Sequence, residues 1–203
     1  MIVGLSMAGC TPGNGSRDDR PNAVDDNRNA VSGMPTPTLM TSPPAAAERR
    51  DEMEGAAGFN GTVGVTEKEN KNVTELASLS AVRTARHDGY DRAVFEFAGA
   101  EMPTYHIEYI SKPASACGSG FDVPTAGNAV LEVRFTNAVA HTDEGEPTIA
   151  DRERKPGLPV IRELKSTCDF EGEVTWVLGT ASKKEYRVME LKSPTRLVVD
   201  IKH

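Results

Sequence analysis

Large apolar residues recur at every second position in five short segments of the chain, and this period of two constrains the fold more than any other feature. A period of two is typical of a β-strand with one buried face, because successive side chains of a strand point to opposite sides of the sheet. No amphipathic pattern as long as a helix of about eleven residues interrupts these segments. The alternating segments are residues 92–97, 105–109, 131–135, 174–178 and 196–201.

Turn signals separate the alternating segments at short intervals. Asp88-Gly89, Gly118-Ser119-Gly120, Glu171-Gly172 and Ser193-Pro194 are of this kind. Three weaker candidate strands are residues 79–87, 158–165 and 186–191, and the charged residues 142–156 form a loop or a short helical turn. The pattern predicts an all-β fold, a small β-sandwich of about seven or eight mostly antiparallel strands, with an open barrel as the related solution.

The first third of the chain has a different composition. Of the eleven aromatic residues only Phe59 lies before residue 71, whereas the other ten follow from Tyr90 onward. Prolines, glycines and small polar residues fill residues 11–71, which cannot bury enough apolar area to offset the entropy of ordering them. We therefore predict a disordered linker over residues 11–71 and a single folded domain over residues 72–203.

The first ten residues are apolar and end in small side chains before a cysteine. Met7-Ala8-Gly9-Cys10 resembles the lipobox of a bacterial lipoprotein signal peptide, in which the cysteine thiol receives the lipid. Residues 1–10 are then a signal-peptide remnant, and a start codon further upstream would explain the missing positive residues. The alternative is a short apolar N-terminus with an incidental cysteine. The lipobox places the protein outside the cytoplasm, anchored to the cell membrane through Cys10.

The net charge of −7 is spread along the chain. Residues 11–70 hold six basic and ten acidic side chains, and the rest of the chain is close to balanced. Because no basic run or face stands out, the composition argues against a nucleic-acid partner.

Cys117 and Cys168 both lie in the predicted domain and beside turns. In an exported protein two such cysteines favour a disulfide, which would close a loop of about fifty residues. The alternative is two buried thiols that never meet.

No residue pattern indicates catalysis, a metal or a cofactor. The four histidines lack ligand spacing and fit surface positions, and Gly118-Ser119-Gly120 lacks the frame of a nucleophile motif. Trp176 alternates with Val174 and Leu178, so a core position is favoured over stacking on a sugar ring.

Three blocks resemble the strands of AMIN-like domains, which occur in bacterial lipoproteins. They are Tyr90-Asp91-Arg92-Ala93-Val94-Phe95-Glu96-Phe97, then Phe170-Glu171-Gly172-Glu173-Val174-Thr175-Trp176, and a closing run from Tyr186 that ends in Arg196-Leu197-Val198-Val199-Asp200-Ile201. The likeness spans about residues 72–203 and keeps the order of the blocks.

The resemblance implies a β-sandwich that binds peptidoglycan or another cell-wall glycan without catalysis. On the polar faces of the predicted strands, Arg92, Glu96 and Arg134 are the candidate ligand-binding residues. The alternative function is a lipoprotein that engages another envelope protein through its sheet surface and has no glycan ligand.

Overall fold

A computed structural model describes residues 58–71 and 74–203 of the chain, all within the unit Pro43–His203. The predicted lipidation site at Cys10 and most of the predicted linker lie outside the described residues. Among the described residues, no helix is long and apolar enough to cross a membrane.

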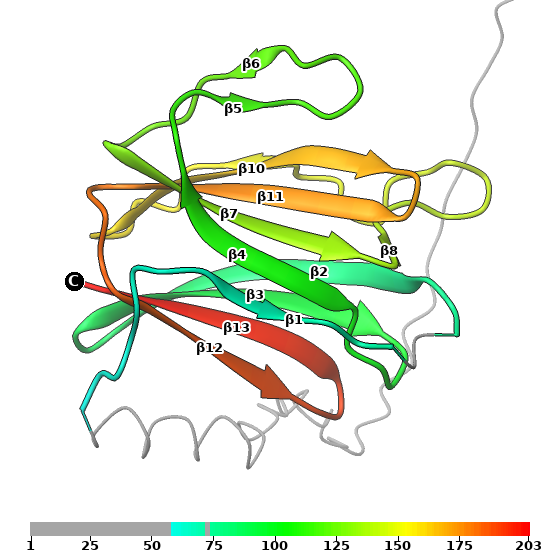
Figure 1. Ribbon diagram of the computed structural model, residues 1–203, viewed down its shortest axis with the longest axis horizontal. Helices are drawn as coiled ribbons and strands as arrows, with labels where there is room; N and C mark the ends of the chain where they lie inside the picture. Colours follow the sequence, from blue (N-terminus) through cyan, green and yellow to red (C-terminus); the bar gives the residue numbers. More distant parts are fainter. Residues whose placement is uncertain (1–57, 72–73) are drawn as a thin grey trace, which may run out of the picture. The chain divides into compact units, whose positions relative to one another are not determined.

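The described chain is built of β-strands, as the alternation predicts (Figure 1). Eight of them have six residues or more, in agreement with the expected number: β2 (Ala77–His87), β3 (Tyr90–Ala98), β4 (Thr104–Ile110), β7 (Ala129–Thr136), β10 (Ile161–Phe170), β11 (Glu173–Thr180), β12 (Tyr186–Leu191) and β13 (Thr195–Lys202). The short strands are β1 (Thr66–Lys68), β5 (Ala114–Ser115), β6 (Asp122–Val123), β8 (Ala138–Val139) and β9 (Glu153–Arg154).

The strands form two larger sheets and a small hairpin. One sheet has the order β1-β4-β7-β11-β10-β9, and the other has the order β12-β13-β3-β2-β8. All pairs are antiparallel except β2 with β8. Figure 1 shows the six-stranded sheet above the five-stranded one, with the β5–β6 hairpin at the top of the view.

The core lies between the inward faces of the two sheets. Phe95 and Phe97 of the five-stranded sheet pack edge-on against Phe135 of the six-stranded sheet, with ring centroids 5.3 and 4.9 Å apart. Trp176 is fully buried among them, which confirms its predicted core position. The inward residues of β3, β7, β11 and β13 are those that the alternation marked, so hydrophobic burial fixes the register of each strand.

β1 corrects the predicted start of the domain at residue 72. Its residues Thr66–Lys68 were assigned to the linker, yet they pair with Tyr105–Ile107 of β4. Thr62 also exchanges two backbone hydrogen bonds with Tyr186 of the other sheet. The segment therefore runs from the edge of one sheet to the edge of the other. Backbone pairing at the sheet edges holds the segment in place, so it needs no alternating apolar residues.

The β5–β6 hairpin lies on the outer face of the six-stranded sheet. A small second core forms under it from Ala114, Val130 and Val177. Cys117 and Cys168 are joined by a disulfide, with their Cα atoms 5.2 Å apart, and the Cys117 N–H donates to the Thr167 carbonyl of β10. The disulfide and this hydrogen bond join the hairpin turn to β10, while the base of the hairpin packs on Val130 of β7 and Val177 of β11.

Asp91 connects the two sheets at one end of the sandwich. Its carboxylate is fully buried and accepts hydrogen bonds from the backbone N–H groups of Val160 and Ile161, at 2.5 and 2.9 Å. The His203 ring nitrogen Nε2 lies 2.9 Å from the other carboxylate oxygen. One side chain of β3 thus holds both the start of β10 and the C-terminus.

Candidate functional site

The three residues expected to bind a ligand lie on two different sheets. Arg92 and Glu96 alternate with core residues on β3, and Arg134 alternates with Val133 and Phe135 on β7. Because each points away from the core, Arg134 lies on the outer face opposite to that of Arg92 and Glu96. The structure does not bring the three together.

Arg92 and Glu96 are engaged within the domain. The Arg92 guanidinium donates from Nε to Asp200 Oδ1 at 2.7 Å and from Nη2 to Oδ2 at 3.1 Å, and Asp200 is fully buried. Glu96 accepts a hydrogen bond from Arg83 on the neighbouring strand β2. These ion pairs occupy the charges that would otherwise meet a ligand.

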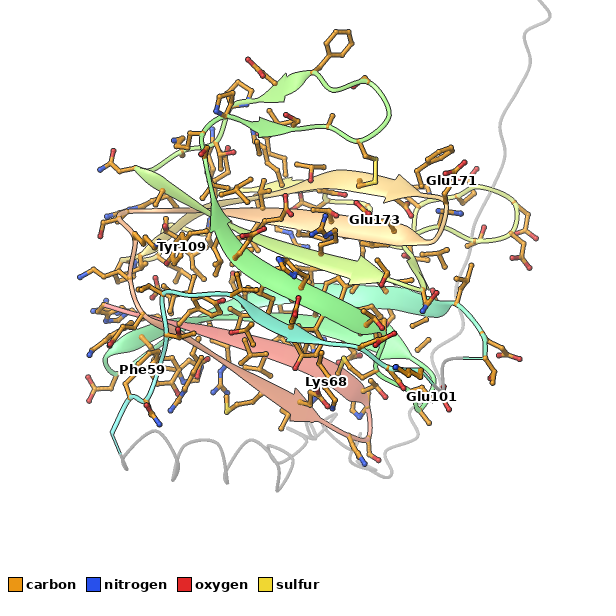
Figure 2. All side chains as sticks on the ribbon, viewed as in Figure 1. Phe59, Lys68, Glu101, Tyr109, Glu171 and Glu173 are labelled. Atoms are coloured by element: carbon orange, nitrogen blue, oxygen red, sulfur yellow. A yellow bond between two sulfur atoms is a disulfide. The ribbon has the colours of Figure 1, made fainter. Side chains whose placement is uncertain are left out.

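Arg134 lies at the centre of an open polar area on the six-stranded sheet. The register places it between His106 of β4 and Thr175 of β11, while Glu132 of the same strand face is paired with Glu108. We call the area formed by Glu67, His106, Glu108, Glu132, Arg134 and Glu173 the Arg134 face. Figure 2 shows Glu173 on β11, on the side of the area toward the β10–β11 turn.

Charges on the Arg134 face are incompletely paired. Neither Arg134 nor Glu132 forms a hydrogen bond or an ion pair with another residue of the described chain, although both side chains are half-buried. His106 is held at Nδ1 by Glu67 at 2.9 Å, and its Nε2 lies 3.2 Å from Glu108 without a hydrogen bond. The Arg134 and Glu132 side chains act on each other only through their charges, and neither forms a hydrogen bond within the described chain.

Burial raises the pKa of Glu132 above the ordinary glutamate value. Arg134 and His106 act in the opposite direction, whereas the like charges of Glu108 and Glu173 raise the pKa further. Directly opposed like charges destabilise a pair of strands. The ionised form of Glu132 is therefore disfavoured, chiefly by burial, and a cation placed beside Glu132 and Glu108 would favour it.

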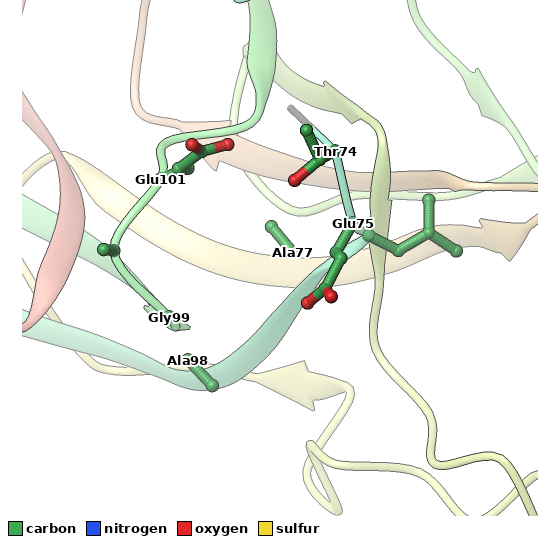
Figure 3. Close-up of a pocket in the computed structure, with 8 residues that line it drawn as sticks. Thr74, Glu75, Ala77, Ala98, Gly99 and Glu101 are labelled. Carbon is green, nitrogen blue, oxygen red and sulfur yellow. The ribbon is translucent and has the colours of Figure 1, made fainter. Parts of the chain in front are cut away.

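A second concave feature lies at the end of the sandwich where β2 begins. A groove of about 1020 Å³ is lined by Glu75, Leu76, Ser78, Val139, His141 and the loop residues 142–145. Beside it is a smaller hollow between Thr74–Ala77 and Ala98–Glu101, which Figure 3 shows with Glu75 and Glu101 on its two sides. We call the larger feature the Leu76 groove.

Buried hydrogen bonds hold the wall of the Leu76 groove. Asp169 accepts from the Ala140 N–H at 2.8 Å and from Arg152 Nη2 at 2.6 Å, and its Oδ1 lies 2.8 Å from His141 Nδ1. Burial disfavours the ionised form of Asp169, but the hydrogen bonds from Ala140, Arg152 and His141 outweigh it and lower the pKa of the carboxyl. The groove is therefore preformed.

The described residues contain no group of three or more His, Cys, Asp or Glu side chains that could hold a metal ion. Gly118-Ser119-Gly120 forms the turn of the β5–β6 hairpin, where the Ser119 N–H donates to the Cys117 carbonyl and both glycines have positive φ. Positive φ at a turn suits glycine, so the local geometry explains this motif.

Comparison with known proteins identifies the family. The family model of the AMIN-like domain matches residues 77–203, from the first residue of β2 to the C-terminus. The chain belongs to the AMIN-like family. No curated protein and no solved structure matches the chain.

Membership of this family assigns the AMIN-like domain to the extracytoplasmic cell envelope. Domains of the family are generally non-catalytic binding modules associated with peptidoglycan. The matched residues contain most of the Arg134 face, although Glu67 of β1 lies before them.

The alternation alone placed Arg134, Glu132, His106 and Glu108 on polar strand faces. Their meeting depends on which strands are neighbours, because β4 and β7 are adjacent in the sheet with Glu108 directly opposite Glu132. Of the three candidate residues, the sequence could not separate a free arginine from one bound by Asp200, since that ion pair joins residues 108 positions apart.

Replacement of Glu132 by Gln should stabilise the AMIN-like domain at neutral pH. In the unfolded chain this carboxyl has the ordinary pKa of about 4.5, and in the fold its pKa is higher. Folding therefore favours the protonated form, and the stability that this gives is lost as the pH rises from the ordinary value through the raised one. Thermal unfolding of wild type and Glu132→Gln from pH 4 to pH 8 measures this.

The melting temperature of Glu132→Gln should exceed that of wild type at pH 7 and converge with it at the acidic end. Glu171→Gln, a change at an exposed turn residue, is the matched control and should follow wild type at every pH. A Glu132→Gln variant that is less stable than wild type at pH 7 would contradict a raised pKa of Glu132 in the fold.

Proposed function

We propose that this chain is a lipid-anchored, non-catalytic module of the cell envelope that attaches to peptidoglycan through the Arg134 face. The observation that carries the proposal is that the half-buried guanidinium of Arg134 and the half-buried carboxylate of Glu132 beside it form no hydrogen bond within the described chain. Partly desolvated charges without partners are unfavourable within a fold, so they are expected where a ligand supplies the partner.

The surroundings of Arg134 favour binding over a purely solvated role. β4, β7 and β11 are long paired strands, so the polar groups of the face are held on rigid elements. Arginine suits the recognition of carboxylates and sugar oxygens, because its planar guanidinium donates two parallel hydrogen bonds. The disulfide-linked hairpin bounds the face at the end where it packs on Val130 of β7 and Val177 of β11.

Replacement of Arg134 by Gln should weaken binding to insoluble peptidoglycan sacculi. The loss of one or two charge-assisted hydrogen bonds corresponds to roughly tenfold in affinity or more. Sedimentation of the full-length chain with purified sacculi at low salt measures it. Arg86→Gln, which removes an exposed arginine from β2, is the control and should sediment as wild type does.

Equal sedimentation of Arg134→Gln and wild type would contradict the assignment of the Arg134 face. Wild type that stays entirely in the supernatant would contradict peptidoglycan attachment altogether.

The anchoring part of the proposal rests on the sequence Met7-Ala8-Gly9-Cys10. Mass spectrometry of the protein extracted from membranes should show a mature N-terminus at Cys10 with a thioether-linked diacylglycerol. Cys10→Ser should abolish the modification and release the protein from the membrane fraction. An unmodified Cys10 within an uncleaved N-terminus would contradict the lipid anchor.

A second candidate function is the binding of another envelope protein at the Leu76 groove. Leu76 is 54 % exposed on its floor, and Glu75, Asp143 and Glu144 form no ion pair with any described residue. An apolar floor with an acidic rim complements a cationic protein segment that carries an apolar side chain.

A synthetic peptide of alternating Lys and Leu should bind wild type more tightly than one of alternating Glu and Leu. The combined change Leu76→Ser with Asp143→Asn should weaken this binding several-fold, whereas Asp122→Asn on the hairpin should not. Fluorescence anisotropy of labelled peptides is the measurement. Equal affinity for both peptides would contradict a charge-selective groove.

A further inference from the structure

We propose that the Arg134 face recognises the peptide stems of peptidoglycan by their ammonium and carboxylate groups, and not the sugar backbone. The inference rests on the proposed function and names the part of the polymer that this face binds. It follows from the kinds of groups that the face presents and from their arrangement.

Peptidoglycan offers two chemically different surfaces. Its glycan strands present mainly hydroxyl and acetamido groups, which are neutral. Its peptide stems carry free carboxylates, and a stem with an uncrosslinked diamino acid also carries an ammonium group. A site for the stem therefore needs both signs of charge, whereas a site for the glycan needs hydrogen-bonding groups and flat apolar area.

The carboxylates of the Arg134 face are placed to hold a cation. Glu108 and Glu132 are directly opposite across β4 and β7, which puts their Cβ atoms roughly 5 Å apart. Glu173 lies on β11, next to the pair of strands, and its Oε1 accepts a hydrogen bond from Thr175 Oγ1 at 3.1 Å. An ammonium group between Glu108 and Glu132 would offset the burial, and the lesser repulsion from Glu108, that raise the pKa of Glu132.

Arg134 is placed to hold the carboxylate of the same ligand. It follows Glu132 by two residues on the same strand face, a rise of roughly 7 Å. Its guanidinium is free to form a bidentate pair. The anionic and cationic subsites are therefore adjacent, at a spacing that the long side chains can adjust to an amino acid with both groups.

Exposed aromatic rings lie away from this centre. Phe170, which is 58 % exposed, is paired with Glu173 at the end of β10 and stands two strands from β7. Phe121, which is 75 % exposed, belongs to the hairpin that is fixed over β10. Among the described residues, none of the exposed large apolar side chains comes from β4 or β7, the strands that carry Arg134 and Glu132. The centre of the face thus provides charges and no ring on which a sugar would stack.

The test compares three probes with the full-length chain: intact sacculi, glycan strands stripped of their stems by an amidase, and a soluble synthetic stem peptide with a diamino acid at its third position. Intact sacculi should bind, stripped strands should bind at least tenfold more weakly, and the free stem peptide should displace the protein from sacculi.

Variants and modified peptides then assign each subsite. Acetylation of the side-chain amine of the stem should weaken binding to wild type but not to Glu132→Gln, and amidation of its carboxylate should weaken binding to wild type but not to Arg134→Gln. Phe170→Ala is the control for sugar stacking and should bind sacculi as wild type does.

The outcomes separate this inference from the function on which it rests. Stripped strands that bind as tightly as intact sacculi, with binding lost in Phe170→Ala, would overturn stem recognition and leave peptidoglycan attachment in place. A chain that binds neither preparation would overturn the proposed function itself. Equal loss of affinity on acetylation in wild type and in Glu132→Gln would remove Glu132 from the ammonium subsite.

Discussion

The buried carboxylate of Asp91 fixes how the two sheets meet at one end of the sandwich. It sits on β3 of one sheet and accepts the backbone N–H groups of Val160 and Ile161 at the start of β10 in the other. These N–H groups are far from water, and without an acceptor each would cost roughly 1–3 kcal/mol. Hydrophobic burial holds the sheets together but is not directional. The hydrogen bonds of this carboxylate fix the position of β10 relative to β3 at one end.

Two other carboxylates also accept backbone N–H groups, in segments that lie outside the strand ladders. Glu163 accepts the Ala126 N–H at 2.6 Å beneath the segment after the hairpin, and Asp169 accepts the Ala140 N–H beside the Leu76 groove. Both side chains come from β10, so this strand positions the long connections on its side of the sheet. The loops are thereby held against β10, and the hairpin covers the sheet at Val130 of β7 and Val177 of β11, so the Arg134 face is the part of these strands beyond the hairpin.

The long strands could be predicted from the sequence, including β2 and β12, which were weaker candidates at residues 79–87 and 186–191, whereas the bounds of β10 and the short strand β1 could not. β3, β7, β11 and β13 are each paired on both sides within a sheet, and their inward residues keep a period of two. β10 was expected at residues 158–165 and is found at Ile161–Phe170, because two register shifts move its side chains between faces. β1 has no apolar residue to mark it. Polar residues that meet across strands were assigned to faces correctly, but their partners depend on strand order, which the pattern does not contain.

The contrast between Arg92 and Arg134 shows how a structural charge differs from a binding one. In the sequence both arginines alternate with apolar residues and so belong to the polar face of a strand. In the sheets, however, Arg92 is opposite Asp200, whereas Arg134 is opposite His106 and Thr175. The first pairing neutralises the guanidinium within the fold, and the second leaves it free beside a glutamate that itself faces a like charge. A face selected only for stability would place opposite charges at these positions. The like-charged pair Glu108 and Glu132 on β4 and β7 is therefore the feature that supports the binding role proposed for this side of the sheet.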